Sequence, residues 1–115
     1  MLLLSAQQII AAADMKFVDV NVPEWGGDVR LRVMSGTDRD RFEREWQAAD
    51  GKMMDAFRQK LLVKCLCDAS NKRLFDDAGI EALGAKNATV LSRLFDQCMK
   101  LNGFVKDTVE ELAKN

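Results

Sequence analysis

The fold of this chain is decided by residues 18–33, which read VDVNVPEWGGDVRLRV. Apolar and polar residues alternate on both sides of a central Pro-Glu-Trp-Gly-Gly segment, and this two-residue period is typical of half-buried strands. Proline presets φ and glycine tolerates positive φ, so the central segment can reverse the chain without strain. The stretch therefore predicts a β-hairpin over 17–34. Its buried face would carry Val18, Val20, Val22, Val29, Leu31 and Val33.

The remainder of the chain has the periodicity of helices. Apolar residues from Phe42 to Cys65 recur every three or four positions and stay in phase for more than six turns, which favours one long helix. Asp50-Gly51 interrupts this stripe, and glycine costs about 1 kcal/mol in a helix interior. We expect a break or bend at that point. The helix that follows it would run to about Cys67.

Capping signals define shorter helices on both sides of this stripe. Ser5 with Gln8 forms a capping-box pattern, which predicts a helix from Ala6 to Ala13 that buries Ile9 and Ile10. Further helices are predicted to start at Asp76 or Asp77 and at Asn87. The last of these carries the strongest apolar face of the chain. Between them, Leu74 and Phe75 follow a polar connector and are predicted to insert into the core.

These elements predict a single α+β domain over residues 1–115, with an N-terminal hairpin (17–34) packed against a helical part (38–115) of four to five helices. At 115 residues and 12.9 kDa, the chain is long enough to bury about two-thirds of its unfolded surface. It should therefore fold without disulfides or metal.

Composition narrows the function classes. The chain has 17 basic and 18 acidic residues, a net charge of −1, and the two signs alternate along the helices. A nucleic-acid partner is therefore not expected, because such binders gain affinity from a basic stripe. The sequence also contains no histidine and no tyrosine, which removes the commonest general base and metal ligand. We predict no enzymatic activity, no catalytic residue, no metal and no cofactor.

Two local patterns resemble metal-binding sites, but the spacing of their residues does not fit such sites. Cys65 and Cys67 would lie on different sides of a helix, and Cys98 alone cannot complete a tetrahedral zinc site, so all three cysteines are interpreted as buried thiols. The acidic stretch 68–79 does not fit a calcium-binding loop, since arginine stands where glycine is required and glycine stands where glutamate is required.

Location follows from the same kind of reasoning. The apolar run at residues 1–4 is short, has no basic flank and is interrupted by Gln7 and Gln8, so neither a secretory signal nor a membrane span is predicted. Three cysteines, an odd number, fit free thiols in a reducing compartment. We expect a cytoplasmic protein without a membrane partner.

After these exclusions, binding of a partner through apolar surface residues is the remaining class of function. Trp25 sits at the hairpin tip, and Met53 with Met54 forms a pliable pair on the long stripe, followed by Phe57. Methionine-rich faces suit partners of variable sequence, and an exposed tryptophan is a common anchor in interfaces. Trp25, Met53, Met54 and Phe57 are therefore the candidate partner-binding residues, although a methionine or an aromatic residue at helical spacing more often belongs to the core.

The order of these motifs resembles a known family. Several segments, taken in order, resemble the tail assembly chaperones of long-tailed bacteriophages and prophages. These segments are residues 22–27 (VPEWGG) with 29–32 (VRLR), residues 35–43 (SGTDRDRFE), Leu74-Phe75, residues 81–84 (EALG), Leu101-Asn102-Gly103 and residues 109–115. The resemblance covers about residue 17 to the end, and Pro-Glu-Trp-Gly-Gly is its most specific part.

The resemblance implies a non-enzymatic chaperone. Such proteins bind the long helical tape measure protein, keep it soluble, help it recruit tail tube subunits, and are absent from the finished virion. This chain would correspond to the short form of a pair whose longer form arises by frameshifting. Weak reversible contacts, each burying about 1,000 Å² or less, would suffice if self-association multiplied them. The alternative is a structural minor tail or head–tail joining protein retained in the virion.

Overall fold

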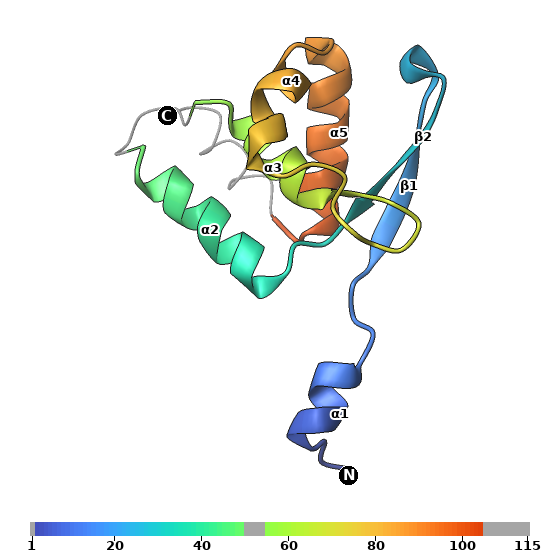
Figure 1. The fold of residues 1–115 in the computed structure, drawn as a ribbon, viewed down its shortest axis with the longest axis vertical. Coiled ribbons are helices and arrows are strands. Elements are labelled where there is room, and N and C mark those ends of the chain that lie inside the picture. Colours follow the sequence, from blue (N-terminus) through green and yellow to red (C-terminus); the bar gives the residue numbers. More distant parts are fainter. Residues whose placement is uncertain (1, 50–54, 105–115) are drawn as a thin grey trace.

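The computed structural model describes residues 2–49 and 55–104, which form an α+β fold (Figure 1). A three-stranded sheet and five α-helices make up these residues, which confirms the predicted class of a hairpin with a helical remainder. In chain order the elements are α1 (Ala6–Ala11), β1 (Phe17–Val22), the 3-10 turn η1 (Pro23–Trp25), β2 (Gly27–Arg32), α2 (Gly36–Gln47), α3 (Phe57–Cys65), β3 (Leu66–Cys67), the 3-10 turn η2 (Asp77–Gly79), α4 (Ile80–Gly84) and α5 (Ala88–Leu101).

The hairpin has the register that the alternating pattern requires. Strands β1 and β2 are antiparallel, with Val18 opposite Leu31 and Val20 opposite Val29, so the apolar side chains of both strands share one face. A third strand, β3, pairs antiparallel with β2 and places Leu66 opposite Leu31. The prediction that a helix continues to Cys67 was therefore wrong at its end. The chain leaves the helix at Leu66, whose extended backbone (φ −64°, ψ 123°) pairs with the free edge of β2.

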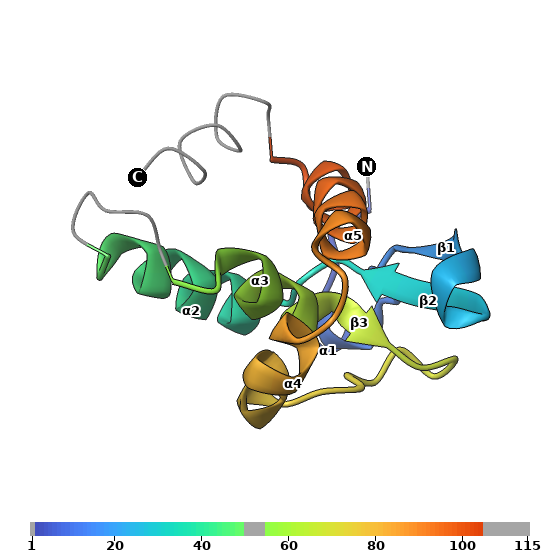
Figure 2. The ribbon, with the colours of Figure 1, turned by 90° about the horizontal axis from the view of Figure 1, so that it is seen from above.

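Helices α3 and α5 cover the apolar face of this sheet. Both contact β2, α5 also contacts β1, and the two helices pack against each other. Figure 2 shows α5 and α3 on the same side of the three strands. Phe57 of α3 and Phe95 of α5 meet edge to face, with ring centroids 5.4 Å apart. The fully buried side chains include Leu31, Phe42, Leu61, Leu62, Leu66, Leu94 and Met99.

The long apolar stripe is shared between two helices. Helix α2 ends at Gln47 and α3 begins at Phe57, after Ala56 in the left-handed region (φ +54°). The two helices contact each other, so the stripe is folded back and does not form one continuous helix. The predicted position of the break, Asp50-Gly51, lies outside the described residues.

Two burial predictions were wrong. The capping box of α1 is present, with Ser5 and Gln8 bonded to each other's backbone N–H groups, yet Ile9 and Ile10 are exposed. Helix α1 lies apart from the other elements, beyond the start of β1 (Figure 1). Leu74 is also half exposed, whereas its neighbour Phe75 packs against the core. Capping involves residues close together in the chain and can be predicted from the sequence. Burial also requires that another element pack against the helix, which the local sequence does not specify.

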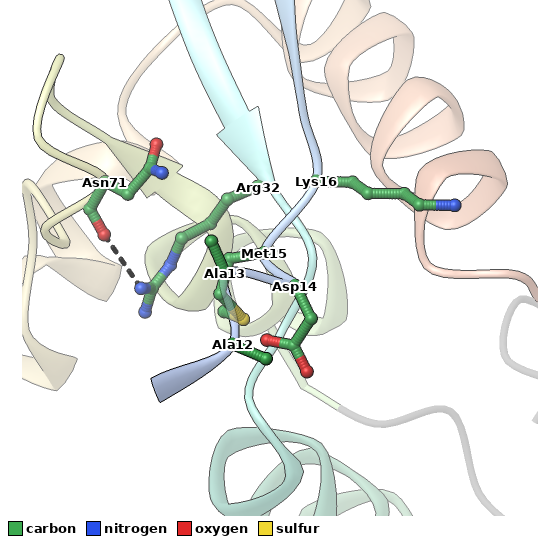
Figure 3. A pocket seen from close by; sticks show the side chains of 7 residues that line it. All are labelled: Ala12, Ala13, Asp14, Met15, Lys16, Arg32 and Asn71. Carbon is green, nitrogen blue, oxygen red and sulfur yellow. Dashed lines mark hydrogen bonds between the residues drawn. The ribbon is translucent and has the colours of Figure 1, made fainter. Parts of the chain in front are cut away.

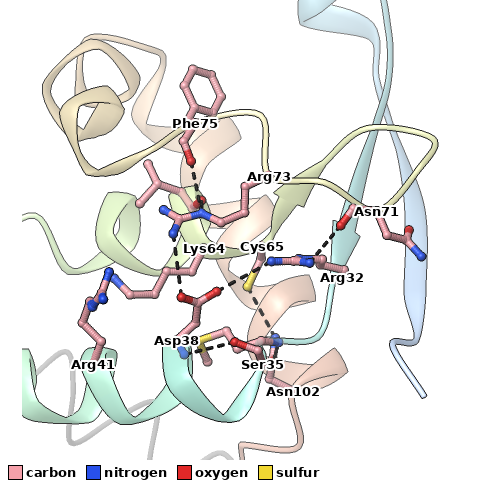
Figure 4. Close-up of polar contacts among 12 residues, drawn as sticks. Arg32, Ser35, Asp38, Arg41, Lys64, Cys65, Asn71, Arg73, Phe75 and Asn102 are labelled. Atoms are coloured by element: carbon pink, nitrogen blue, oxygen red, sulfur yellow. Dashed lines mark hydrogen bonds and ion pairs between the residues drawn. The ribbon is translucent and has the colours of Figure 1, made fainter. Parts of the chain in front are cut away.

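A polar cluster joins the sheet to the helices (Figure 4). The Asp38 carboxylate lies between the guanidinium groups of Arg32 and Arg73, at 3.6 and 3.7 Å, and is 13% exposed. The backbone N–H of Asp38 donates to Ser35 Oγ, which caps α2. Arg73 Nε also donates to the carbonyl oxygens of Val63 and Phe75. One carboxylate therefore ties the end of β2 to the start of α2 and to the loop after β3.

Lys64 is the one charged residue in the described part of the chain that is fully buried. Its ammonium group donates to Glu45 Oε1 of α2 at 2.9 Å and to the Lys60 carbonyl oxygen at 3.0 Å. A buried charge is tolerated only when it is paired, because desolvation of an unpaired ammonium group costs several kcal/mol. This ion pair therefore fixes how α2 lies against α3.

We expect Glu45→Ala to lower the free energy of unfolding by about 3 kcal/mol, because it leaves the buried Lys64 ammonium group without its ionic partner. Lys64→Met keeps most of the volume and removes the charge, so it should cost less than about 1 kcal/mol or stabilise the fold. Urea denaturation followed by circular dichroism measures both. The control is Glu43→Gln, which breaks an exposed pair with Arg39 and should cost about 0.5 kcal/mol or less. Equal costs for Glu45→Ala and Glu43→Gln would contradict this account.

Candidate functional site

An apolar groove lies between the hairpin tip, the loop after β3 and α4. Its volume is about 450 Å³, and most of its exposed wall is apolar. The buried side chains Leu66 and Leu83 contribute to its floor, and Leu74, which is 53% exposed, stands at its wall. The full lining is Trp25, Val29, Leu66, Leu74, Phe75, Ala82, Leu83 and Lys86. A groove of this size and polarity is suited to binding apolar side chains.

The turn chemistry of the hairpin positions Trp25 in this groove. Pro23 opens the 3-10 turn η1, and Gly26 closes it in the left-handed region at φ +80°, donating its N–H to the Pro23 carbonyl oxygen. A residue with a side chain would be strained at Gly26. The turn leaves the Trp25 ring partly buried against the core, with one side open to the groove.

Charges fasten the same turn to the helices. Arg93 of α5 donates two hydrogen bonds to the Glu24 carboxylate, at 2.9 and 3.0 Å. This bidentate contact, together with a backbone hydrogen bond, lowers the pKa of Glu24 from 4.5 to about 2. The ammonium group of Lys86 lies 6.0 Å from the centre of the Trp25 ring. The residue before Trp25 is thus tied to α5, and a cation lies near the Trp25 ring.

The opposite wall is held by backbone contacts. The Leu74 N–H donates to the Leu66 carbonyl oxygen at 2.9 Å, which continues the pairing of β3 into the following loop. Phe75 then turns inward against Gly79, where a Cβ atom would come within 2.8 Å of the Phe75 ring. This close approach explains the glycine at 79. It also leaves Leu74 on the open side of the loop.

A second, more polar pocket of about 610 Å³ lies where the segment Ala12–Lys16 joins β1 (Figure 3). Arg32 crosses it and donates to the Asn71 carbonyl oxygen at 2.8 Å. Much of its wall is formed by the connector between α1 and β1. The shape of this pocket therefore depends on where that connector lies. We regard the apolar groove lined by Trp25, called the Trp25 groove below, as the better candidate site.

Of the four sequence-predicted residues, Trp25 and Phe57 lie in the described part of the chain, and they take different positions there. Trp25 lines the groove, whereas Phe57 is 6% exposed and belongs to the core between α3 and α5. Met53 and Met54 lie outside the described residues. Sequence reasoning missed Leu74 and Lys86. The position of Leu74 after a polar connector could have indicated an exposed binding residue, but the sequence pattern was interpreted as that of a residue inserted into the core.

Cys65, Cys67 and Cys98 are free and buried, which confirms their interpretation as structural thiols. Burial raises the pKa of Cys67, and a hydrogen bond with Cys65 together with burial raises that of Cys98, so neither is a reactive thiolate at neutral pH. Across residues 2–49 and 55–104, cysteine and acidic side chains form no group of three that could hold a metal ion. No helix in these ranges has the length and apolarity needed to cross a bilayer.

Comparison with known proteins identifies the family. A family model described as phage tail assembly chaperone matches residues 5–115. The chain belongs to the phage tail assembly chaperone family. Among solved structures, the bacteriophage HK97 tail assembly chaperone is similar, with 26% sequence identity, a TM-score of 0.62 and coverage of 87% of this chain and 95% of that one. No curated protein matches the sequence. The resemblance found in the Pro-Glu-Trp-Gly-Gly hairpin is therefore confirmed.

The Glu24–Arg93 contact predicts a pH dependence at the hairpin tip of this chaperone. Because the pKa of Glu24 is lower in the folded chain than its ordinary value of 4.5, the contact stabilises the fold above pH 4.5 and is lost as the pH falls towards 2. A carboxyl-carbon NMR titration should give a Glu24 midpoint near 2. Arg93→Gln should raise that midpoint towards 4.5, whereas Arg44→Gln, on the exposed face of α2, should not move it. A Glu24 midpoint unaffected by Arg93→Gln would refute the assignment.

Proposed function

We propose that this chaperone binds apolar helical segments of the tape measure protein in the Trp25 groove, keeps that protein soluble and helps it recruit tail tube subunits. It does so without catalysis, in the cytoplasm of the bacterial host, and is absent from the mature virion. The observation that carries this proposal is the family match over residues 5–115. The groove adds a surface on which such a contact could form.

The chemistry of the groove supports a helical client. An amphipathic helix presents apolar side chains at every third or fourth position, and a hydrophobic groove accepts them as anchors. Trp25 and Leu74 supply apolar contact area, while Lys86 at the rim can pair with an acidic residue of the client. A groove of about 450 Å³ holds only a few side chains, so each contact would be weak and reversible. Many copies along one long client would then provide the overall affinity.

The other predicted residues take different parts in the proposal. Met53 and Met54 remain candidates for direct client contact, because methionine side chains adapt to variable partners. Phe57 acts through packing, since its ring lies against Phe95 in the core. Tail tube recruitment rests on the family resemblance alone and is assigned to no residue.

Co-expression with the tape measure protein of the same genome tests the proposal directly. Affinity capture should recover a soluble complex, and the tape measure protein expressed alone should aggregate. If both this chain and a frameshifted longer form fail to capture or solubilise it, the proposal is wrong.

Within this assay, Leu74→Glu should lower capture of the tape measure protein at least about tenfold, because it places a charge in the apolar groove. Leu74 is half exposed, so the fold should survive. The matched control is Phe17→Glu, which changes an apolar residue that is 48% exposed and lies outside the groove. Equal capture by both variants would exclude the groove. The double variant Met53→Glu/Met54→Glu tests the remaining candidates in the same way and should lose capture without unfolding.

The alternative of a structural minor tail or head–tail joining protein predicts a different location. Mass spectrometry of purified virions should detect the tail tube protein and not this chain. Detection of this chain in stoichiometric amounts would replace the chaperone proposal by the structural one.

A further inference from the structure

The N-terminal arm, defined as residues 2–11, exposes an apolar surface that the rest of the described chain leaves uncovered. Every residue from Leu2 to Asp14 is exposed. The large apolar side chains and their exposed fractions are Leu2 81%, Leu3 82%, Leu4 57%, Ile9 60% and Ile10 85%. Single exposed apolar residues are ordinary, but five within nine positions form a patch that marks an interaction site.

The arm has a specified conformation, although it is too short to be stable by itself. Ser5 and Gln8 complete a capping box, and Leu4 and Ile9 occupy the positions that pair in a hydrophobic staple. They are also the two least exposed of the five large apolar side chains. A helix of six residues is nevertheless only marginally formed in water without tertiary contacts. The sequence therefore encodes a helix that requires a docking surface.

The Trp25 groove has the complementary chemistry. Residues 2–13 carry no charged side chain, so inserting the arm buries no charge in the groove. Asp14 lies three residues after the end of α1, and the groove carries one cation, Lys86, in its lining. The negative C-terminal end of α1 and the Asp14 carboxylate both suit a position near that cation. The apolar contacts would hold the arm in the groove, and the charges would place the C-terminal end of α1 near Lys86.

A second copy of the chain is the partner that fits the geometry. The arm extends beyond the start of β1, whereas Trp25 lies at the other end of that strand (Figure 1). The arm is exposed in this position, and none of its large apolar side chains is covered by the described part of its own chain. The structure therefore presents the arm to a neighbour and away from its own groove.

We propose that the N-terminal arm of one copy docks in the Trp25 groove of a second copy, with Leu4, Ile9 and Ile10 as the inserted side chains. Exchange of both arms closes the contact into a symmetric dimer. Burying one leucine or isoleucine removes on the order of 100 Å² of apolar surface. Six such side chains from two arms account for on the order of 600 Å², and the groove surfaces that they cover bring the total to the roughly 1,000 Å² expected of a specific interface.

This contact would occupy the groove that the proposed function assigns to the client. The arm then covers the apolar groove until a client helix displaces it, which would protect an aggregation-prone surface. Self-association through the arm does not itself require the tape measure protein. It can therefore be tested on the isolated chain.

Analytical ultracentrifugation of the full chain over a range of concentrations provides the test. The wild type should shift from the 12.9 kDa monomer to a larger species as concentration rises. Ile10→Glu should raise the dissociation constant at least about tenfold, because a carboxylate would enter the apolar groove. Gln7→Glu adds the same charge to the same helix without removing an apolar side chain, and it should associate like the wild type. A wild-type chain that stays monomeric, or equal effects of Ile10→Glu and Gln7→Glu, would overturn the proposal.

A mixing experiment separates this contact from other forms of association. Ile10→Glu keeps an intact groove, and Leu74→Glu keeps an intact arm, so each alone should be largely monomeric. An equimolar mixture should recover one arm-in-groove contact and form a heterodimer. A mixture that remains monomeric would contradict the pairing of arm and groove. If self-association fails while Phe17→Glu and wild type still capture the tape measure protein, only this inference falls and the proposed function stands.

Discussion

The apolar face of the β1–β2 ribbon has to be covered, and this constraint organises the molecule. A two-stranded hairpin is at best marginally stable in water. Val18 and Leu31 lie opposite each other, and Leu66 of β3 lies opposite Leu31 from the other side. Helices α3 and α5 pack over this face. The hairpin tip places Trp25 in a groove with Ala82 and Leu83 of α4, where the apolar cover is incomplete.

Ion pairs then fix the orientation of elements that apolar packing alone would leave variable. Asp38 joins two arginines from separate segments, Lys64 binds Glu45 between two helices, and Arg93 holds Glu24 at the hairpin tip. The first two are largely shielded from water, so loss of one partner leaves an uncompensated charge. The third is exposed and stabilises less, but its bidentate geometry sets the direction of the tip.

The groove and the arm suggest how a chaperone of this fold could expose an apolar binding surface without aggregating. A chaperone needs apolar surface that is open to a client and yet does not cause the chaperone itself to aggregate. The Trp25 groove is small, rimmed by Lys86 and flanked by charged segments, which limits the area exposed at any time. Under our proposal, the arm of a second copy covers the groove in the absence of client. Under the same proposal, weak contacts of this kind would be exchanged as the tape measure protein binds and leaves.

The sequence by itself determined the hairpin, its register, the capping residues Ser5 and Asn87, and the family, because alternation and capping are local and involve neighbours in the chain. Tertiary structure decided the rest. Leu66 ends a helix to pair with β2, Phe57 packs against Phe95 in the core, and Leu74 faces the groove. Ile9 and Ile10 remain exposed although they are the large apolar residues of a correctly predicted helix. Hydrophobic periodicity shows that a side chain needs an apolar partner. Which surface provides that partner depends on contacts between distant segments, and for the arm, under our proposal, it depends on a second chain.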